Sequence, residues 1–202
     1  MSGFGISAEV FSGVAVVVSV YSLWRTTLRG ADLRIFVPPL IRYASPYQNS
    51  VFEVFEIPLT AINEGAQTGT ILSFDLEVRN AQTGVSKLFY SAGLGPWSLA
   101  KAKGEGLAPF TPVSLTGRSS QSETVLFYAR NDSRVQQIVE APATFEFTII
   151  PLTARRRGLF RRKPKSLAFE MTLPHLDHRA FTSGSGSLPL HNARWQPNAG
   201  KV

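Results

Sequence analysis

The chain contains no cysteine, and only three of its 202 residues are histidine. Without cysteine there is no disulfide framework, no thiolate nucleophile and no cysteine-based metal site. The absence fits reducing and oxidising compartments alike, so it does not indicate on which side of a membrane the protein lies. All three histidines, His175, His178 and His191, fall near the C-terminus. His175 and His178 stand three residues apart, but this pair lacks the helix, the intervening glutamate and the third ligand of a zinc hydrolase site, so we expect no metal.

Motifs of the common enzyme classes are missing as well. The sequence has no phosphate-cradling glycine loop and no dinucleotide fingerprint, and the Gly-Ser-Gly at 184–186 lacks the strand-to-helix setting of a serine nucleophile. The carboxylates that could form a catalytic pair lie along predicted strands, where we expect solvated sheet faces: Glu53, Glu56, Asp75 and Glu77. The sequence therefore predicts a non-catalytic protein without a cofactor.

One long apolar run, Val10 to Trp24, contains no charged residue. As a helix these fifteen residues rise only about 22 Å, against roughly 30 Å of hydrocarbon, so a membrane span needs an extension. It extends either through Arg25 to Leu28, with the arginine reaching the interface, or back through Phe4 to Ala8, with Glu9 near the far interface. The residues assigned to this membrane anchor are Val10, Phe11, Val14, Val17, Val18, Tyr21 and Trp24.

Two other interpretations of the run fit less well. A secretory signal peptide would need a basic segment before the run and a small-residue cleavage site after it, and neither is present. A buried helix of a soluble domain would show a polar face, which this run lacks. Tyr21 and Trp24 stand where an aromatic belt marks a membrane boundary, close to Arg25. We therefore predict a single-pass anchor over residues 1–30.

Flanking charge predicts the orientation of this anchor. Arg25, Arg29 and Arg34 follow the run and no cation precedes it, which predicts a cytoplasmic C-terminal domain. The alternative is an extracytoplasmic domain that binds a ligand or an envelope component.

A stripe of small residues within the run either packs against a second membrane helix or arises by chance in a helix rich in valine and serine: Ser12, Ala15, Ser19 and Ser22.

Residues 31–173 alternate between apolar and polar side chains and are interrupted by turn residues. In the segment 70–79, for example, Leu72, Phe74, Leu76 and Val78 form the predicted core face. Pro58 indicates an edge position or a bulge. About eight such strands predict an antiparallel, immunoglobulin-like β-sandwich. Residues 174–202 have no period, and we expect a poorly ordered tail.

One strand-turn-strand segment, LTAINEGAQTGTI at 59–71, carries a resemblance. Together with the N-terminal membrane helix and the Pro-Pro after the first strand, it resembles a group of uncharacterised bacterial single-pass membrane-anchored β-sandwich proteins over residues 5–150. The resemblance implies structural roles for Asn63, Gly65 and Gly69, and it implies no activity.

The net charge of +7 is concentrated in one segment, residues 154–166, between the last two predicted strands. Without its seven cations the chain has 14 Lys and Arg against 14 Asp and Glu, which disfavours a general nucleic-acid binder. The segment either docks on anionic lipid, or is a solvated loop or protein-binding loop, or contacts nucleic acid. We predict an interaction module whose basic segment docks it on the membrane and which binds a protein partner. The contact residues are Arg155, Arg156, Arg157, Leu159, Phe160, Arg161, Arg162, Lys163 and Lys165.

Overall fold

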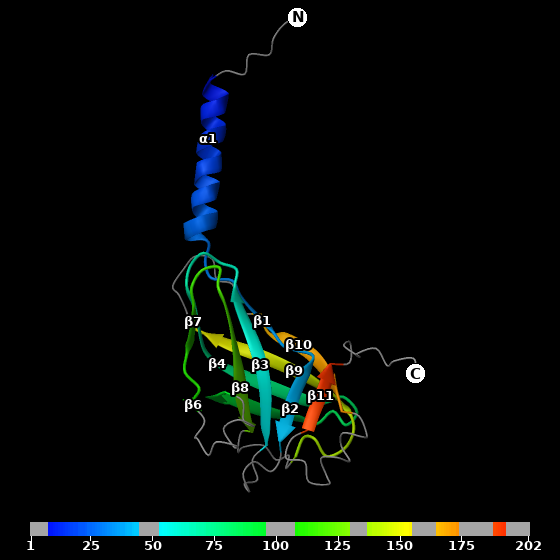
Figure 1. Cartoon of the computed structure of the whole chain (residues 1–202). Coiled ribbons are helices and arrows are strands. Elements are labelled where there is room, and N and C mark those ends of the chain that lie inside the picture. The colour runs from blue at the N-terminus through cyan, green and yellow to red at the C-terminus, as the bar shows by residue number, and fades with distance from the viewer. Residues whose placement is uncertain are drawn as a thin grey trace, which may run out of the picture.

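The computed structural model describes residues 8–44, 53–95, 108–129, 137–154, 165–173 and 188–192. Helix α1 (Ala8–Leu23) continues into a turn of π-helix, η1 (Trp24–Leu28), and projects from one end of a β domain (Figure 1). The strands are β1 (Leu33–Phe36), β2 (Leu40–Ala44), β3 (Val54–Asn63), β4 (Gly69–Asn80), β5 (Ser86–Leu94), β6 (Ala108–Pro109), β7 (Val113–Leu115), β8 (Ser120–Ala129), β9 (Thr144–Thr153), β10 (Leu167–Thr172) and β11 (Leu188–Asn192).

The strands form one antiparallel sheet that closes on itself. Strand β4 pairs with β5 on one side and β9 on the other, and the ladder continues from β5 through β8, β3, β2, β11 and β10 back to β9. Side chains just fill the interior of an eight-stranded ring. The prediction of mainly antiparallel β structure with an N-terminal apolar helix is confirmed. The immunoglobulin-like sandwich is not, because a sandwich has two sheets with free edges and these pairings form a ring.

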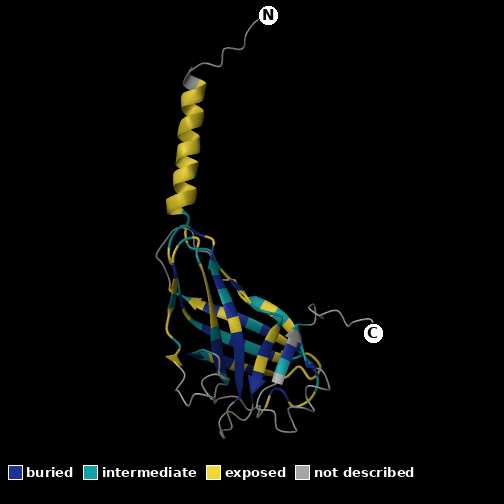
Figure 2. Ribbon diagram, in the orientation of Figure 1, coloured by how far each residue is buried: buried dark blue, intermediate teal, exposed yellow. Residues whose placement is uncertain are grey.

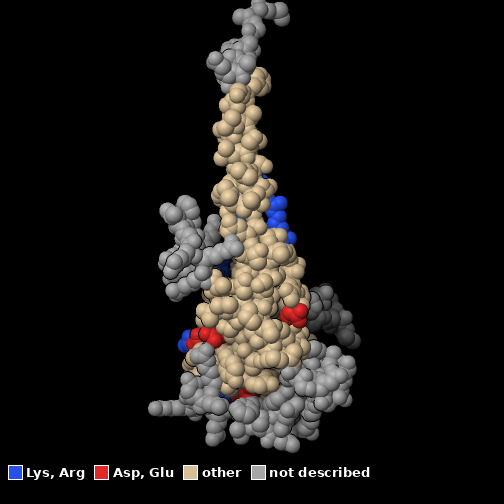
Figure 3. Space-filling model, turned by 90° about the vertical axis from the view of Figure 1, so that its left-hand side faces the viewer, with Lys and Arg blue, Asp and Glu red and all other residues tan. Residues whose placement is uncertain are grey.

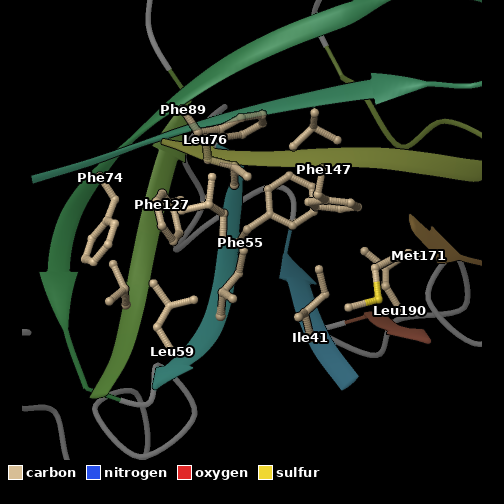
Figure 4. Packing of buried hydrophobic residues seen from close by; sticks show 14 of the residues in the cluster. Ile41, Phe55, Leu59, Phe74, Leu76, Phe89, Phe127, Phe147, Met171 and Leu190 are labelled. Carbon is tan, nitrogen blue, oxygen red and sulfur yellow. The ribbon is translucent and has the colours of Figure 1, made fainter. Parts of the chain in front are cut away.

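Two strands that the sequence did not predict account for this difference. Strand β2 comes directly after the Pro-Pro that follows the first predicted strand, and β11 lies in the expected tail. Strand β11 pairs with β2 through Leu190 and Ile41, and with β10 through Asn192 and Met171, so it bridges the two halves of the domain. Ile41, Met171 and Leu190 are fully buried, and their side chains meet inside the ring (Figure 4).

The core centres on the ring of Phe55 from β3. Its centroid lies 5.0 Å from that of Tyr43, 4.9 Å from Phe89 and 5.3 Å from Phe147, the last two in edge-to-face geometry. Such pairs add about 0.5–1.5 kcal/mol each to the energy of burial. Because these rings come from β2, β5 and β9, Phe55 packs against both its own side of the ring and the opposite one (Figure 4).

A β-bulge corrects the face that we predicted for the start of β4. Ile71 is fully buried, whereas Leu72, predicted in the core, is 40% exposed. The register with β9 shifts between Ile71 and Ser73, so β4 places two residues where β9 places one. From Phe74 onward the predicted core face is buried.

Pro58 occupies the one stretch of β3 where a missing backbone donor costs little. It pairs with Thr124 of β8 on one side. On the other side of β3, β2 pairs with residues 54–56 and β1 pairs with residues 60–63, so Pro58 lies in the gap between these two neighbours. The predicted edge position is therefore confirmed locally, inside an otherwise central strand.

Replacing Phe55 by alanine is expected to lower the free energy of unfolding by about 3–5 kcal/mol, because three rings lose their common partner. Chemical denaturation of purified protein measures this loss. Phe36→Ala is the matched control, since Phe36 is 50% exposed, and should cost less than about 1 kcal/mol. Equal losses in the two variants would contradict the assigned core.

Candidate membrane interface

Helix α1 and η1 are exposed from residue 10 to residue 28 (Figure 2), and most of the side chains from Val10 to Trp24 are apolar. Residues Val10–Leu28 are long and apolar enough to cross a membrane, and none of this stretch is buried against the β domain. Every residue assigned to the anchor is exposed: Val10, Phe11, Val14, Val17, Val18, Tyr21 and Trp24. A continuous apolar surface of this kind is unfavourable in water and marks a contact with lipid or with another protein.

The helix joins the β domain through three segments, 28–32, 63–69 and 115–119, which we call the collar. Backbone hydrogen bonds link the first two segments. The carbonyl of Arg29 accepts from the N–H groups of Ala66 at 3.0 Å and Gln67 at 3.2 Å, and the carbonyl of Asp32 accepts from Glu64 at 2.9 Å. The connection after the helix is therefore bonded to the domain rather than left as a free linker.

The side-chain amide of Asn63 holds the collar together and is fully buried. Its Oδ1 accepts from the N–H groups of Asp32 at 3.1 Å and Gly65 at 3.0 Å. Its Nδ2 donates to the carbonyls of Gln67 at 2.8 Å, Leu115 at 3.1 Å and Thr116 at 3.0 Å. One amide thus bonds all three collar segments, which agrees with the structural role that the resemblance implies for this residue.

Two collar glycines allow these segments to touch. A Cβ atom at Gly65 would lie 2.1 Å from the carbonyl oxygen of Gly30, and one at Gly117 would lie 2.0 Å from that of Ala66. Both distances are far inside van der Waals contact with backbone atoms, so only glycine fits. A Cβ atom at Gly69 would lie 2.9 Å from the Cβ atom of Ala31.

Cationic side chains gather at the foot of the helix, as the space-filling view shows (Figure 3). Arg29 in the collar pairs with Asp32 at 3.1 Å, and Arg34 in the adjoining strand β1 pairs with Glu64 at 2.9 Å. Arg118, from the turn between β7 and β8, donates from Nη2 to the carbonyl oxygen of Arg25 at 3.2 Å. The residues next to the apolar helix therefore carry the positive charge that the orientation prediction relied on.

The described residue that precedes the basic cations, Ala154, bonds to the domain beside the collar. The N–H of Ala154, the residue after β9, donates to the carbonyl of Thr70 at 3.0 Å, and Thr70 follows Gly69, which pairs with Leu115. Arg155, the first cation of the basic segment, comes next in the chain. Lys165 is exposed. The other predicted contacts lie outside the described residues: Arg155, Arg156, Arg157, Leu159, Phe160, Arg161, Arg162 and Lys163.

The far end of β3 holds a buried ionic cluster that the sequence reading missed. Glu53, expected on a solvated face, is fully buried. Its carboxylate accepts from the Tyr43 hydroxyl at 2.5 Å and the Ile138 N–H at 2.7 Å, and it contacts the ammonium group of Lys87. Alternation along a strand cannot reveal this cluster, because its members lie 10, 34 and 85 residues away from Glu53. With three donors on one carboxylate, we assign the cluster a structural role.

The remaining candidate chemistry is sparse. Glu56, also expected to be solvated, is largely buried and lies 3.6 Å from Arg42. A groove of about 400 Å³ runs outside β3 and β8, and Glu123 is its one ionisable lining residue. Among the described residues, no group of three or more metal-ligating side chains comes together.

Comparison with known proteins gives little further information. No family model matches the chain, and no curated protein matches it. One similar solved structure is a Bordetella pertussis protein described as the "Putative ApaA Protein", with 14% identity and a TM-score of 0.33 over 83% of this chain and 98% of that one. A similarity this low carries no argument about fold or function.

Asn63→Asp is expected to lower the free energy of unfolding by about 2–5 kcal/mol, because a carboxylate cannot donate to the three carbonyls that Nδ2 now serves. Asn80→Asp is the matched control. Asn80 uses only Oδ1, which accepts from Gln82 and Thr83 in an exposed turn, so its change should be below about 0.5 kcal/mol. Thermal and denaturant unfolding measure both, and similar values for the two would remove Asn63 from its assigned role.

Glu53→Gln should cost about 3–5 kcal/mol of stability, because it leaves the Lys87 ammonium buried without a counter-charge. In a double-mutant cycle with Lys87→Met, the double variant should be more stable than the sum of the two losses predicts. Additive losses would show that the two side chains do not interact as the structure places them.

Proposed function

We propose that this protein is a non-catalytic interaction module, anchored in a membrane by α1 and η1, whose basic segment docks the β domain on the anionic membrane surface. The position of Ala154 supports the docking part most directly. The described residue that precedes the seven cations of 155–165 bonds to Thr70 beside the collar, and the collar is the end of the domain nearest the membrane if the helix spans it.

Charge makes such docking favourable. Each lysine or arginine near an anionic surface contributes about 1 kcal/mol, and the attraction decays within about 8–10 Å at ordinary ionic strength. Leu159 and Phe160, between the two groups of cations, would enter the headgroup region. The anionic leaflet is the cytoplasmic one, and Arg25, Arg29 and Arg34 favour the same side for the domain.

An exposed apolar face on the outside of the ring supports a protein partner. Asp75 of β4 pairs with Tyr90 of β5 on one side and with Ile150 of β9 on the other, so these side chains share the outer face. Tyr90, Ile150 and Leu152 are exposed there. Soluble domains keep such faces small unless they form contacts.

Site-specific labelling tests the docking, since the chain has no native cysteine. Full-length Gly158→Cys, carrying a polarity-sensitive fluorophore, is reconstituted into phosphatidylcholine vesicles with or without 30% phosphatidylglycerol. We expect the fluorescence emission to shift to the blue in vesicles with the anionic lipid, and 0.5 M salt to reverse this shift. The emission should not shift when all seven cations are replaced by glutamine. Val85→Cys, in the turn between β4 and β5, which is at the opposite end of β4 from the collar residue Gly69, is the control. The same spectrum of the Gly158 label in both vesicles would refute docking.

A further inference from the structure

Arg118 adopts a backbone conformation that arginine rarely adopts. Among the described residues it is the one non-glycine with a positive φ, at 57°. This left-handed region brings Cβ close to the following carbonyl, so glycine or asparagine is usual there. The turn is fixed from both sides, because the Arg118 N–H donates to the Gly65 carbonyl at 3.0 Å and Gly117 is pressed against Ala66. A strained residue that persists in a fixed turn suggests a role for its side chain.

That side chain reaches the last turn of the helix. Its Nη2 donates to the carbonyl oxygen of Arg25, one of the carbonyls that a helix C-terminus leaves without an intrahelical partner. This bond uses one of the five N–H donors of the guanidinium group. Among the described residues, Arg29 and Arg34 each form a salt bridge with a carboxylate, whereas neither Arg25 nor Arg118 lies within ion-pair distance of one.

The contact also places the membrane boundary on the helix. A guanidinium group does not lie in the hydrocarbon core when it can reach the interface, so the level of the Arg25 carbonyl is the level of the headgroups. The aromatic rings of Tyr21 and Trp24, with centroids 6.3 Å apart, are exposed just on the apolar side of that level. The boundary therefore lies near Arg25 and not beyond Leu28.

We propose that Arg118 and Arg25 together bind the phosphodiester group of a membrane phospholipid at the foot of the helix. Guanidinium groups bind phosphate oxygens through paired, charge-assisted hydrogen bonds, and the lipid phosphates lie at this level. The inference rests on the membrane insertion of α1 but not on docking by the basic segment. It gives the strained arginine a function that glycine, the residue best suited to this turn, could not supply.

Arg118→Gly separates binding from folding. Full-length protein in detergent micelles is titrated with phosphatidylglycerol, and retention of the first lipid is followed by native mass spectrometry. We expect the variant to bind that lipid about five-fold more weakly or worse, with an unchanged or higher melting temperature, because glycine relieves the strain. Arg118→Lys should bind in between, and Arg79→Gln, whose side chain lies 57% exposed on β4 beside Glu146, should match the parent.

Other outcomes overturn the proposal. Parental affinity in Arg118→Gly would show that there is no site, and loss of lipid together with a lower melting temperature would show that Arg118 only caps the helix. Inorganic phosphate at 20 mM should leave the lipid bound. Displacement of the lipid by phosphate would show that the site binds anions in general and not a phospholipid. If replacing the cations of 155–165 abolishes retention while Arg118→Gly does not, the basic segment binds the lipid and the collar does not.

Discussion

One buried side-chain amide, that of Asn63, determines how the membrane-spanning candidate and the β domain are joined. Its five hydrogen bonds connect the segment after the helix, the turn between β3 and β4, and the turn between β7 and β8. Within the low dielectric of the interior such a network is favourable only when every member is satisfied. Through Leu115 and Thr116, the same network holds the turn that carries Arg118 next to the segment after the helix.

Strand β3 links this collar to the rest of the molecule. Asn63 ends the strand, Phe55 lies at the centre of the core, and Glu53 precedes the strand and binds Tyr43, Lys87 and Ile138 at the far end. Polar networks at both ends with an aromatic cluster between them fix the register and rotation of one strand. We infer that the orientation of the β domain relative to the helix is fixed by this strand and not by the length of a linker.

The sequence predicted the helix and eight of the strands, because apolar runs and strict alternation are local properties. It did not predict β2 and β11, whose short, proline-flanked segments acquire strand structure by pairing with each other. Because these two strands were not predicted, the sequence indicated a sandwich where the structure has a closed ring. The bulge at Leu72 and the burial of Glu53 were missed for the same reason, since both depend on partners far away in the chain. The collar could be inferred only at Asn63, Gly65 and Gly69, through the resemblance, and the contact of Arg118 with Arg25 spans 93 residues.

The most direct test uses the absence of cysteine. Val17→Cys in the helix and Val85→Cys in the β domain are expressed separately, and membrane vesicles of both orientations are treated with an impermeant maleimide. The account predicts that Cys at position 17 reacts in neither preparation until detergent dissolves the membrane and the protein is denatured. Cys at position 85 should react in inside-out vesicles alone. Labelling at position 17 in intact vesicles would contradict the anchor, and labelling at position 85 in right-side-out vesicles would contradict the cytoplasmic placement of the domain.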